Sequence, residues 1–469
     1  MKQCFYAMGG INYKNGVVSC CPRQADQLIF QKDTFLPSEI FNHENFKELR
    51  RKLHKDICPA GCDTCESMEE VGVTSMRQDF TLEKNGSFYK DQGKPPKGAN
   101  IYTVKFYEEF HKEHCPEEHF LIKCYDPETH YVRNEGLRHI ELRFSNACNF
   151  ACIHCSEVFS SGWTKKLENY IPDEETHLYD LKQLLRTEHS HGKQKAGDLK
   201  MALTVDQSLQ IVDDLNENFP YLEHINFAGG ELLYQKQFLP VLKKLGDHPN
   251  ASNIHLSFHS NFNSDFDVEK LSELLLPFKT STITISVDAG KTFYSYFRSG
   301  GTWDQLEKNI KKFREYNDYT WLDITCTTSI YQMLDIYDVF ESFISLEASV
   351  NISIVQSPKY LDPSLILLEF EKETMKDIEK TEKLIESYFD KPIERVSEKT
   401  GHMYWVKHEQ TLEKLHRIVK YIKSFKPKYH DYNRFLIYRK KSDMIWDQNF
   451  NDYFQNYQID EHNELIRVK

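Results

Sequence analysis

The chain has 469 residues, of which 40% are hydrophobic and 28% charged, as in globular proteins with a sizeable core. Its formal net charge of -12 disfavours binding along a nucleic acid backbone, and no apolar run approaches the length of a membrane span. The N-terminus, Met-Lys-Gln-Cys-Phe-Tyr, lacks the apolar segment of a secretory signal, so we expect a cytoplasmic protein. Twelve cysteines in a reducing compartment indicate metal binding or catalysis rather than disulfides.

Residues 1–80 have the features of a small module stabilised by metal. The pair Asn15-Gly16 predicts the tight turn of a hairpin, and residues 41–54 predict a basic helix. The segment is too short and too polar to form much of a core, which is where bound metal contributes most to folding. The module contains these cysteines: Cys4, Cys20, Cys21, Cys58, Cys62 and Cys65.

Residues 81–135 are polar and aromatic, and we expect a connecting region with one or two strands. Residues 136–360 then alternate between strand-like apolar runs and segments of helical periodicity, which predicts an α/β fold of parallel β/α units in a barrel or partial barrel. The expected strands are residues 138–144, 223–228, 253–258, 282–287, 321–328 and 350–355. The expected helices are residues 205–217, 235–246, 266–276, 303–315 and 335–346.

Two further segments complete the expected organisation. The polar stretch 175–200 interrupts the barrel and is interpreted as a surface insertion or lid. Residues 361–469 predict a helical C-terminal extension, with apolar residues at three- and four-residue spacing in 374–388 and 410–425. The basic patches in this extension are typical of solvated faces, so binding of nucleic acid is not expected.

The loop Cys148-Asn-Phe-Ala-Cys152-Ile-His154-Cys155 is the first candidate reaction centre. It directly follows the alternating run 140–144, so a strand can direct three thiols to one point. Three thiolates hold three irons of a 4Fe–4S cluster and leave the fourth iron open to a substrate or cosubstrate. The alternative is a tetrahedral zinc site with His154 as the fourth ligand, or simply buried thiols.

The same spacing recurs at Cys58, Cys62 and Cys65, but this copy follows a helix and has further thiols nearby in the sequence. Four protein thiolates form a closed cluster, which is suited to electron transfer or structure. Because neighbours on a strand point to opposite faces, we expect only one of Cys20 and Cys21 to be a ligand. A zinc site that includes Cys62 and Cys65 is the alternative.

The residues Gly229-Gly230-Glu231 come at the end of the second expected barrel strand. Two glycines let a ligand approach the backbone, and a carboxylate can bind an ammonium group. The carboxyl ends of barrel strands are where such folds place their ligands. This turn is therefore a candidate binding site near the cysteine loop.

The loop 144–155 together with Gly229-Gly230-Glu231 resembles the radical S-adenosylmethionine (SAM) superfamily. The N-terminal cysteines and residues 66–77 resemble the twitch (SPASM-like) auxiliary-cluster subfamily. Shorter segments at 285–290, 297–303 and 355–358 are also similar to the family. The resemblance implies a partial (β/α)6 barrel over 136–360, preceded by an iron–sulfur module over 1–80.

The family resemblance also implies the roles of individual residues. Cys148, Cys152 and Cys155 would bind the catalytic 4Fe–4S cluster, with the amino and carboxylate groups of SAM on its open iron. A second, auxiliary iron–sulfur cluster would be bound by cysteines from the set Cys4, Cys20, Cys21, Cys62 and Cys65, with Cys58 as a possible replacement.

The other residues that the resemblance assigns would contact SAM. Gly229, Gly230 and Glu231 would hold the methionine amine, and Arg298 would bind the carboxylate. The remaining positions are His154 on the adenine side, Ser260 and Asn261 near the ribose or methionine, and Ser286 and Asp288 at the next strand end. Read without the resemblance, these residues would be turn formers (Ser260, Asn261), helix caps (Ser286, Asp288) or a surface ion pair (Arg298).

The implied activity is reductive cleavage of SAM to a 5′-deoxyadenosyl radical, which abstracts a hydrogen atom from a substrate. A peptide or protein side chain is the first expected substrate, and a flavodoxin- or ferredoxin-type protein would supply the electron. A small carbohydrate or nucleotide metabolite is the alternative substrate. The non-enzymatic alternative is a zinc-binding scaffold for protein interaction.

Overall fold

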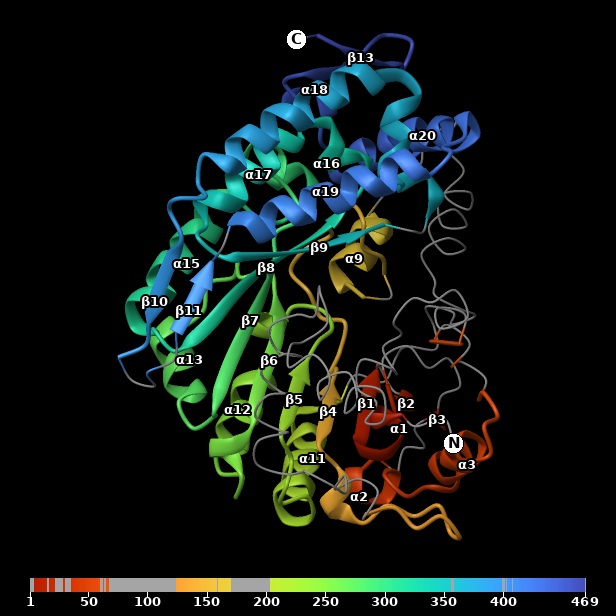
Figure 1. Ribbon diagram of the computed structural model, residues 1–469, viewed down its shortest axis with the longest axis vertical. Coiled ribbons are helices and arrows are strands. Elements are labelled where there is room, and N and C mark those ends of the chain that lie inside the picture. Colours follow the sequence, from red (N-terminus) through yellow and green to blue (C-terminus); the bar gives the residue numbers. More distant parts are fainter. Residues whose placement is uncertain are drawn as a thin grey trace.

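The structure, a computed structural model, is organised around a single nine-stranded sheet (Figure 1). Strands β4 to β9 are parallel, and each pairs with the next one along the chain. This order confirms the expected partial (β/α)6 barrel, and all six expected strands are present. Their bounds are β4 His139–Leu142, β5 His224–Phe227, β6 His255–Ser260, β7 Thr280–Ser286, β8 Thr320–Thr328 and β9 Ser349–Ile354.

Part of the chain is not described by the structure. The expected insertion at 175–200, the Asn15-Gly16 turn and most of the connecting region 81–135 lie outside the described residues. The described residues are 4–14, 17–21, 28–29, 35–59, 62, 65–66, 124–157, 159–169, 203–355, 358–398, 401, 403–406 and 408–468.

The helices between the barrel strands agree with the expected periodic segments. Thr204 shows how one begins: its hydroxyl accepts a hydrogen bond from the Gln207 backbone N–H at 3.1 Å, and the Gln207 side chain accepts one from the Thr204 N–H at 3.0 Å. The barrel helices are α11 Val205–Asn218, α12 Phe238–Leu245, α13 Val268–Leu275, α14 Tyr294–Phe297, α15 Trp303–Tyr316, α16 Ile330–Leu334 and α17 Ile336–Ser345. The 3-10 helices are η1 Asn134–Gly136, η3 Leu232–Tyr234, η4 Ala251–Asn253, η5 Lys291–Phe293, η6 Lys359–Leu361, η7 Pro363–Ile366 and η8 Phe450–Asp452.

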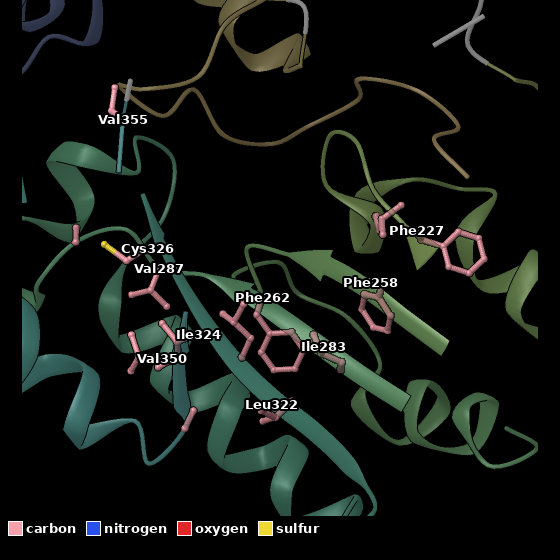
Figure 2. Packing of buried hydrophobic residues seen from close by; sticks show 14 of the residues in the cluster. Phe227, Phe258, Phe262, Ile283, Val287, Leu322, Ile324, Cys326, Val350 and Val355 are labelled. Atoms are coloured by element: carbon pink, nitrogen blue, oxygen red, sulfur yellow. The ribbon is translucent and has the colours of Figure 1, made fainter. Parts of the chain in front are cut away.

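The two faces of the parallel sheet differ in polarity. Apolar strand residues such as Phe227, Phe258 and Ile283 are fully buried with the helices, and Figure 2 shows part of this layer. Because side chains alternate along a strand, the intervening residues share the opposite face, which we call the inner face. This face is lined by Glu141, Arg143, Asn226, Ser257, His259, Thr284, Ser286, Thr325, Thr327, Asn351 and Ser353, most of them half-buried or exposed.

The N-terminal module extends the same sheet. Strand β1 (Gly10–Lys14) pairs in parallel with β4, and β2 (Val17–Ser19) and β3 (Leu28–Ile29) continue outward in antiparallel fashion. The expected basic helix at 41–54 is confirmed as α3. The module's helices are α1 Phe5–Gly9, α2 Pro37–Ile40 and α3 Glu44–His54.

One buried arginine joins the helices of this module. Arg50 on α3 is fully buried, and its Nε donates to the Ala7 carbonyl at 2.8 Å and its Nη2 to the Phe41 carbonyl at 2.7 Å. Its Nη1 donates to the Asn42 side chain at 3.0 Å, and burial lowers the pKa of Arg50 to about 10. The guanidinium therefore satisfies carbonyls that α1 and the end of α2 would otherwise leave buried without a donor.

The C-terminal extension is helical, as expected, but only its first two helices were predicted by periodicity. Helix α20 lacks a single apolar stripe because it packs on several sides, and short strand pairs were also missed. Figure 1 shows α16, α18, α19 and α20 gathered at one end of the molecule. The bounds are α9 Ser161–Asn169, α18 Leu367–Glu386, α19 His408–Ser424, α20 Tyr429–Trp446, β10 Ile393–Val396, β11 Met403–Val406, β12 Tyr457–Ile459 and β13 Leu465–Arg467. None of the helices in the described part of the chain is both long enough and apolar enough to span a membrane.

We predict that Arg50→Met lowers the free energy of unfolding by about 2 kcal/mol, because the carbonyls of Ala7 and Phe41 lose their donor. Urea unfolding followed by tryptophan fluorescence measures this difference. The matched control is Arg51→Met, since Arg51 lies on the same helix but contacts only the exposed Glu48. Equal stabilities of the two variants would contradict the role given to Arg50.

Candidate active site

Cys148, Cys152 and Cys155 lie in the loop that follows β4, where Cys148 is close enough to influence the pKa of both Cys152 and Cys155. Cys152 is 6% exposed, and the other two thiols are half-buried. Burial raises the pKa of all three, that of Cys155 to about 12, and the neighbouring thiols raise the pKa of Cys152 and Cys155 further. The nearby Arg298 cation acts in the opposite direction. Metal binding at this loop must therefore displace protons, which a cationic neighbour favours.

Three side chains donate hydrogen bonds to three successive carbonyls of the cysteine loop. Trp446 Nε1 donates to Ala151 O at 2.6 Å, Trp163 Nε1 to Cys152 O at 2.8 Å, and the Tyr438 hydroxyl to Ile153 O at 2.5 Å. The rings of Trp163 and Trp446 also pack edge to face, with centroids 4.6 Å apart. Helix α20 and helix α9 therefore fix the backbone that carries the thiols.

Sequence reasoning found none of these three donors. Tyr438 and Trp446 lie in the helix that periodicity failed to predict. Tyr438 and Trp446 are separated in the sequence by 285 and 295 residues from the loop residues whose carbonyls they contact. No local sequence pattern therefore predicts these contacts. The one available signal is the type of residue, since a buried Trp or Tyr usually needs an acceptor for its N–H or O–H.

The other edge of the loop is held by backbone. Ala151 N donates to Ser299 O at 2.9 Å and Ile153 N donates to Phe297 O at 3.0 Å. Gly300, with φ of +109°, packs so closely on this loop that an added Cβ would lie 2.9 Å from Asn149 O. Residues 297–300 therefore also support the loop, through its backbone N–H groups.

The Gly229-Gly230 turn packs directly against the backbone that leads into the cysteine loop. Gly230 has φ of +58°, and an added Cβ would lie 2.3 Å from Ala147 O. Glu231 N donates to the same carbonyl at 2.9 Å, and Gln235 Nε2 donates to Gly229 O at 2.9 Å. The glycines thus allow one loop to approach another, and Gln235 is a supporting residue that sequence reasoning missed.

Glu231 is almost fully buried and accepts hydrogen bonds from protein donors. Ser260 Oγ lies 2.7 Å from Oε1 and Asn261 N lies 2.5 Å from Oε2, while Leu233 N donates to Oε1 at 3.1 Å. Burial raises the pKa of the Glu231 carboxyl. The Asn261 side chain donates to Asn149 within the cysteine loop at 2.9 Å. Glu231, Ser260 and Asn261 therefore lie together, and they connect the end of β6 to the cysteine loop.

Asp288, Arg298 and His154 form a second polar group beside the thiols. Asp288 Oδ2 lies 2.6 Å from Arg298 Nη1 and 3.4 Å from His154 Nε2, and its Oδ1 accepts from Thr327 N at 2.8 Å. Burial alone would lower the pKa of Arg298, but Cys152 and Asp288 raise it overall, so the guanidinium stays charged. Burial lowers the pKa of His154, whose ring stacks on Phe297 with centroids 5.0 Å apart.

These contacts decide between the sequence interpretations of this group. Asp288 does not cap a helix, because the 3-10 helix that follows has Gly290 at its N-cap. Its φ of +56° is unusual for a residue with a side chain, and such strain is typical of functional sites. Arg298 is buried, so it is not a surface ion pair. Ser286 is the last residue of β7 and is half-buried on the inner face.

Several buried polar atoms at this site have no hydrogen-bond partner among the described residues. They are His154 Nδ1, Arg298 Nε and Gln235 Oε1. Buried polar groups in folded proteins are almost always paired, so unpaired ones beside a cysteine loop are expected where a polar ligand binds. The site therefore fits an iron–sulfur cluster with SAM, because thiol ligands and unpaired polar atoms occur side by side.

The N-terminal cysteines also gather, although they come from three separate segments. Burial and the neighbouring Cys21 and Cys65 raise the pKa of Cys4 to about 12, and the pKa of Cys62 is raised by burial and by Cys4 and Cys21. Cys20 forms a side-chain hydrogen bond with Cys21, which raises the pKa of Cys20. Strand β2 ends at Ser19, so strand alternation does not apply to Cys20 and Cys21, and the expectation that only one of them is a ligand stays a prediction.

Within the described residues, no three His, Cys, Asp or Glu side chains are placed to hold a single metal ion. His154, offered by the zinc interpretation as a fourth ligand, instead faces Asp288 and Phe297.

Comparison with known proteins gives the class of this site. Residues 142–335 match the sequence model of the radical SAM superfamily, so the chain contains a radical SAM domain, the catalytic domain of radical SAM enzymes. The match spans the cysteine loop, Gly229-Gly230-Glu231, Asp288 and Arg298. No curated protein sequence matches the chain.

Solved structures similar to this chain include native anSMEcpe with bound AdoMet, at 16% identity and a TM-score of 0.33, covering 54% of this chain and 60% of that chain. Streptococcus suis SuiB bound to S-adenosylmethionine matches at 10% identity and a TM-score of 0.32, covering 79% of this chain and 68% of that chain. SuiB bound to precursor peptide SuiA matches at 12% identity and a TM-score of 0.32, covering 74% of this chain and 63% of that chain. The chain thus spans about 60% of the length of anSMEcpe.

We predict that Tyr438→Phe weakens retention of iron at the cysteine loop about tenfold, because Ile153 O loses its donor and supporting contacts of this kind typically change metal affinity by that factor. Iron remaining after a timed challenge with a chelator measures the effect in the anaerobically reconstituted protein. Tyr432→Phe is the matched control, since Tyr432 is a buried tyrosine of the same helix that has no described contact with the loop. Equal iron loss from both variants would contradict the role of Tyr438.

Glu231 predicts a pH dependence of stability in the metal-free protein. Its pKa is raised in the folded state, so its contribution to stability is full below its ordinary pKa of 4.5 and is lost as the pH rises through the raised value. Glu231→Gln removes this titration. The thermal midpoint of Glu231→Gln minus that of the parent protein should therefore increase as the pH rises from about 5. A difference that is constant across pH, or that decreases, would show that the carboxyl is not destabilised by burial.

Proposed function

We propose that this protein is a radical SAM enzyme that abstracts a hydrogen atom from a peptide or protein side chain. The observation that carries the proposal is the cysteine loop, whose three thiols are held from both sides and face Arg298, Asp288 and unpaired buried polar atoms. When bound, the 4Fe–4S cluster and SAM would supply a 5′-deoxyadenosyl radical as the hydrogen-abstracting group. The chain itself supplies the ligands, the orientation and the exclusion of water.

Each residue of the site has a proposed task. Cys148, Cys152 and Cys155 would hold the cluster, and Arg298 would keep a positive charge beside the thiolates and offer its unpaired Nε to SAM. Asp288 orients both Arg298 and His154, which leaves His154 Nδ1 free to contact the adenine side. The tasks proposed for the remaining positions are contacts with SAM at Gly229, Gly230, Glu231, Ser260, Asn261 and Ser286.

The gathered N-terminal thiols support a second proposal, an auxiliary iron–sulfur cluster. Cys4, Cys62 and Cys65, with Cys20 or Cys21, would provide four thiolates, and Cys58 is close enough to influence Cys62. A closed cluster here would pass electrons or stabilise the module. A flavodoxin- or ferredoxin-type protein in the cytoplasm would be the electron donor.

The inner face of the barrel favours a hydrophilic substrate. Its side chains are hydroxyls, amides, an imidazole and an Arg143–Glu141 ion pair, and an apolar group placed against them would leave these polar atoms unpaired. A polar side chain of a peptide meets this condition. A small carbohydrate or nucleotide metabolite meets it too, and this observation is the reason to retain that class as the second candidate.

Anaerobic reconstitution tests the proposed function. We predict about eight irons per chain with matching sulfide, as two 4Fe–4S clusters require, and reductant-dependent conversion of SAM to 5′-deoxyadenosine and methionine. Cys152→Ala should abolish this conversion, whereas Cys124→Ala should not, since the buried Cys124 belongs to neither cysteine group and contacts Arg133. Mass spectrometry of the nucleoside products measures the outcome. Bound zinc without iron, and no cleavage of SAM, would instead support a zinc-binding scaffold.

A further inference from the structure

One row of residues crosses the inner face next to the proposed SAM site, one residue before Gly229 and Ser260 along their strands. Strands β4, β5 and β6 pair in register through Leu142, Phe227 and Phe258. The next residue of each strand extends the row, and Ala228 N continues the ladder by donating to Leu142 O at 3.1 Å. The row is therefore formed by Arg143, Ala228 and His259, continued by Thr284, the partner of His259 on β7.

The row lies next to residues that the site has already defined. Gly229 follows Ala228 and Ser260 follows His259, so β5 and β6 lead from the row into the proposed SAM site within one residue. An added Cβ on Gly229 would lie 3.3 Å from Arg143 Cβ, which places the Arg143 side chain against the Gly229 turn. A substrate that reaches SAM from the barrel interior must pass this row.

Arg143 is held so that part of its guanidinium stays available. Its Nε and Nη2 lie 2.8 Å and 2.7 Å from Glu141 Oε1, and Asn226 Nδ2 donates to Glu141 Oε2 at 3.1 Å. Burial would raise the pKa of Glu141, but Arg143 and the other partners lower it overall, so the pair is ionised. The Arg143 side chain is 19% exposed, and its Nη1 has no partner within the described part of the chain.

His259 is the second available group of the row. Its side chain is exposed, yet the surrounding protein lowers its pKa, as happens on a concave surface. Neither ring nitrogen has a hydrogen-bond partner among the described residues. Between Arg143 and His259 lies Ala228, which is 8% exposed and has the smallest side chain of the row.

We propose that Arg143 and His259 form a subsite for an anionic group of the substrate, a carboxylate or a phosphate, seated over Ala228. The proposal rests on the proposed function and specifies its substrate. A guanidinium offers N–H donors in a fixed fork, and Glu141 fixes the orientation of this one. The imidazole adds a donor from the other side of Ala228. Glu141 faces Arg143 and Asn226, so no free carboxylate of the row repels the anion.

Histidine footprinting tests the subsite without a known substrate. The anaerobically reconstituted protein is treated with diethylpyrocarbonate at about neutral pH, where an imidazole is reactive, with malonate or inorganic phosphate as separate probes. Mass spectrometry follows modification of His259 and of His462, whose side chain is 75% exposed and serves as the internal reference. We expect one of the probes to slow modification of His259 about fivefold at saturation and to leave His462 unchanged.

Two variants connect the protection to Arg143. Arg143→Gln should abolish it, and the double variant Glu141→Gln with Arg143→Gln should do the same without leaving a buried carboxylate unpaired. Arg395→Gln, which removes a half-buried arginine paired with Glu347, should keep full protection. Iron content and the rate of diethylpyrocarbonate modification of His462 establish that each variant is folded.

The outcomes separate the subsite from the proposed function. Protection by malonate alone identifies a carboxylate substrate, and protection by phosphate alone identifies a phosphorylated one. Absence of protection by both probes, or equal protection in the Arg143→Gln protein, overturns the subsite even if the parent protein cleaves SAM. Loss of SAM cleavage in a protein that still shows Arg143-dependent protection overturns the radical chemistry and leaves the anion subsite in place.

Discussion

The structure depends most on the way in which the backbone of residues 151–153 is held. Its carbonyls accept hydrogen bonds from Trp163, Tyr438 and Trp446, and its N–H groups donate to the backbone of 297–299. A short loop that carries three thiols has little core of its own, so its geometry must come from these neighbours. The C-terminal helices are therefore part of the site, since Tyr438 and Trp446 of α20 fix two of the loop carbonyls.

The second constraint is the division of the sheet into an apolar and a polar face. Residues such as Phe227 and Phe258 pack against the helices and stabilise the fold. The alternating residues, among them Arg143 and His259, cannot contribute much to stability in this position, because polar groups there must be matched by water or ligand. We therefore interpret the Arg143–Glu141 ion pair and His259, which lie beside the proposed SAM site, as groups that recognise the substrate.

Much of the architecture could be predicted because its signals are local. Strand and helix periodicities gave the six β/α units, and cysteine spacing with the preceding strand gave the loop Cys148–Cys155. The partners of that loop were not predictable, because α20 carries apolar residues on several sides and meets the loop only after nearly 300 residues of chain. Glu231 shows the same limit at smaller scale: the sequence placed it at a strand end, but its donors, Ser260 and Asn261, come from the next strand.

The claim that Cys148–Cys155 carries an open iron is the centre of this account. It is tested most directly by electron paramagnetic resonance of the reduced protein in which Cys62→Ala and Cys65→Ala remove ligands of the second cluster. The account predicts a remaining 4Fe–4S signal whose g values change when SAM is added, because SAM would bind the iron that no cysteine holds. A signal that SAM leaves unchanged, or the absence of any cluster in this variant, would contradict it.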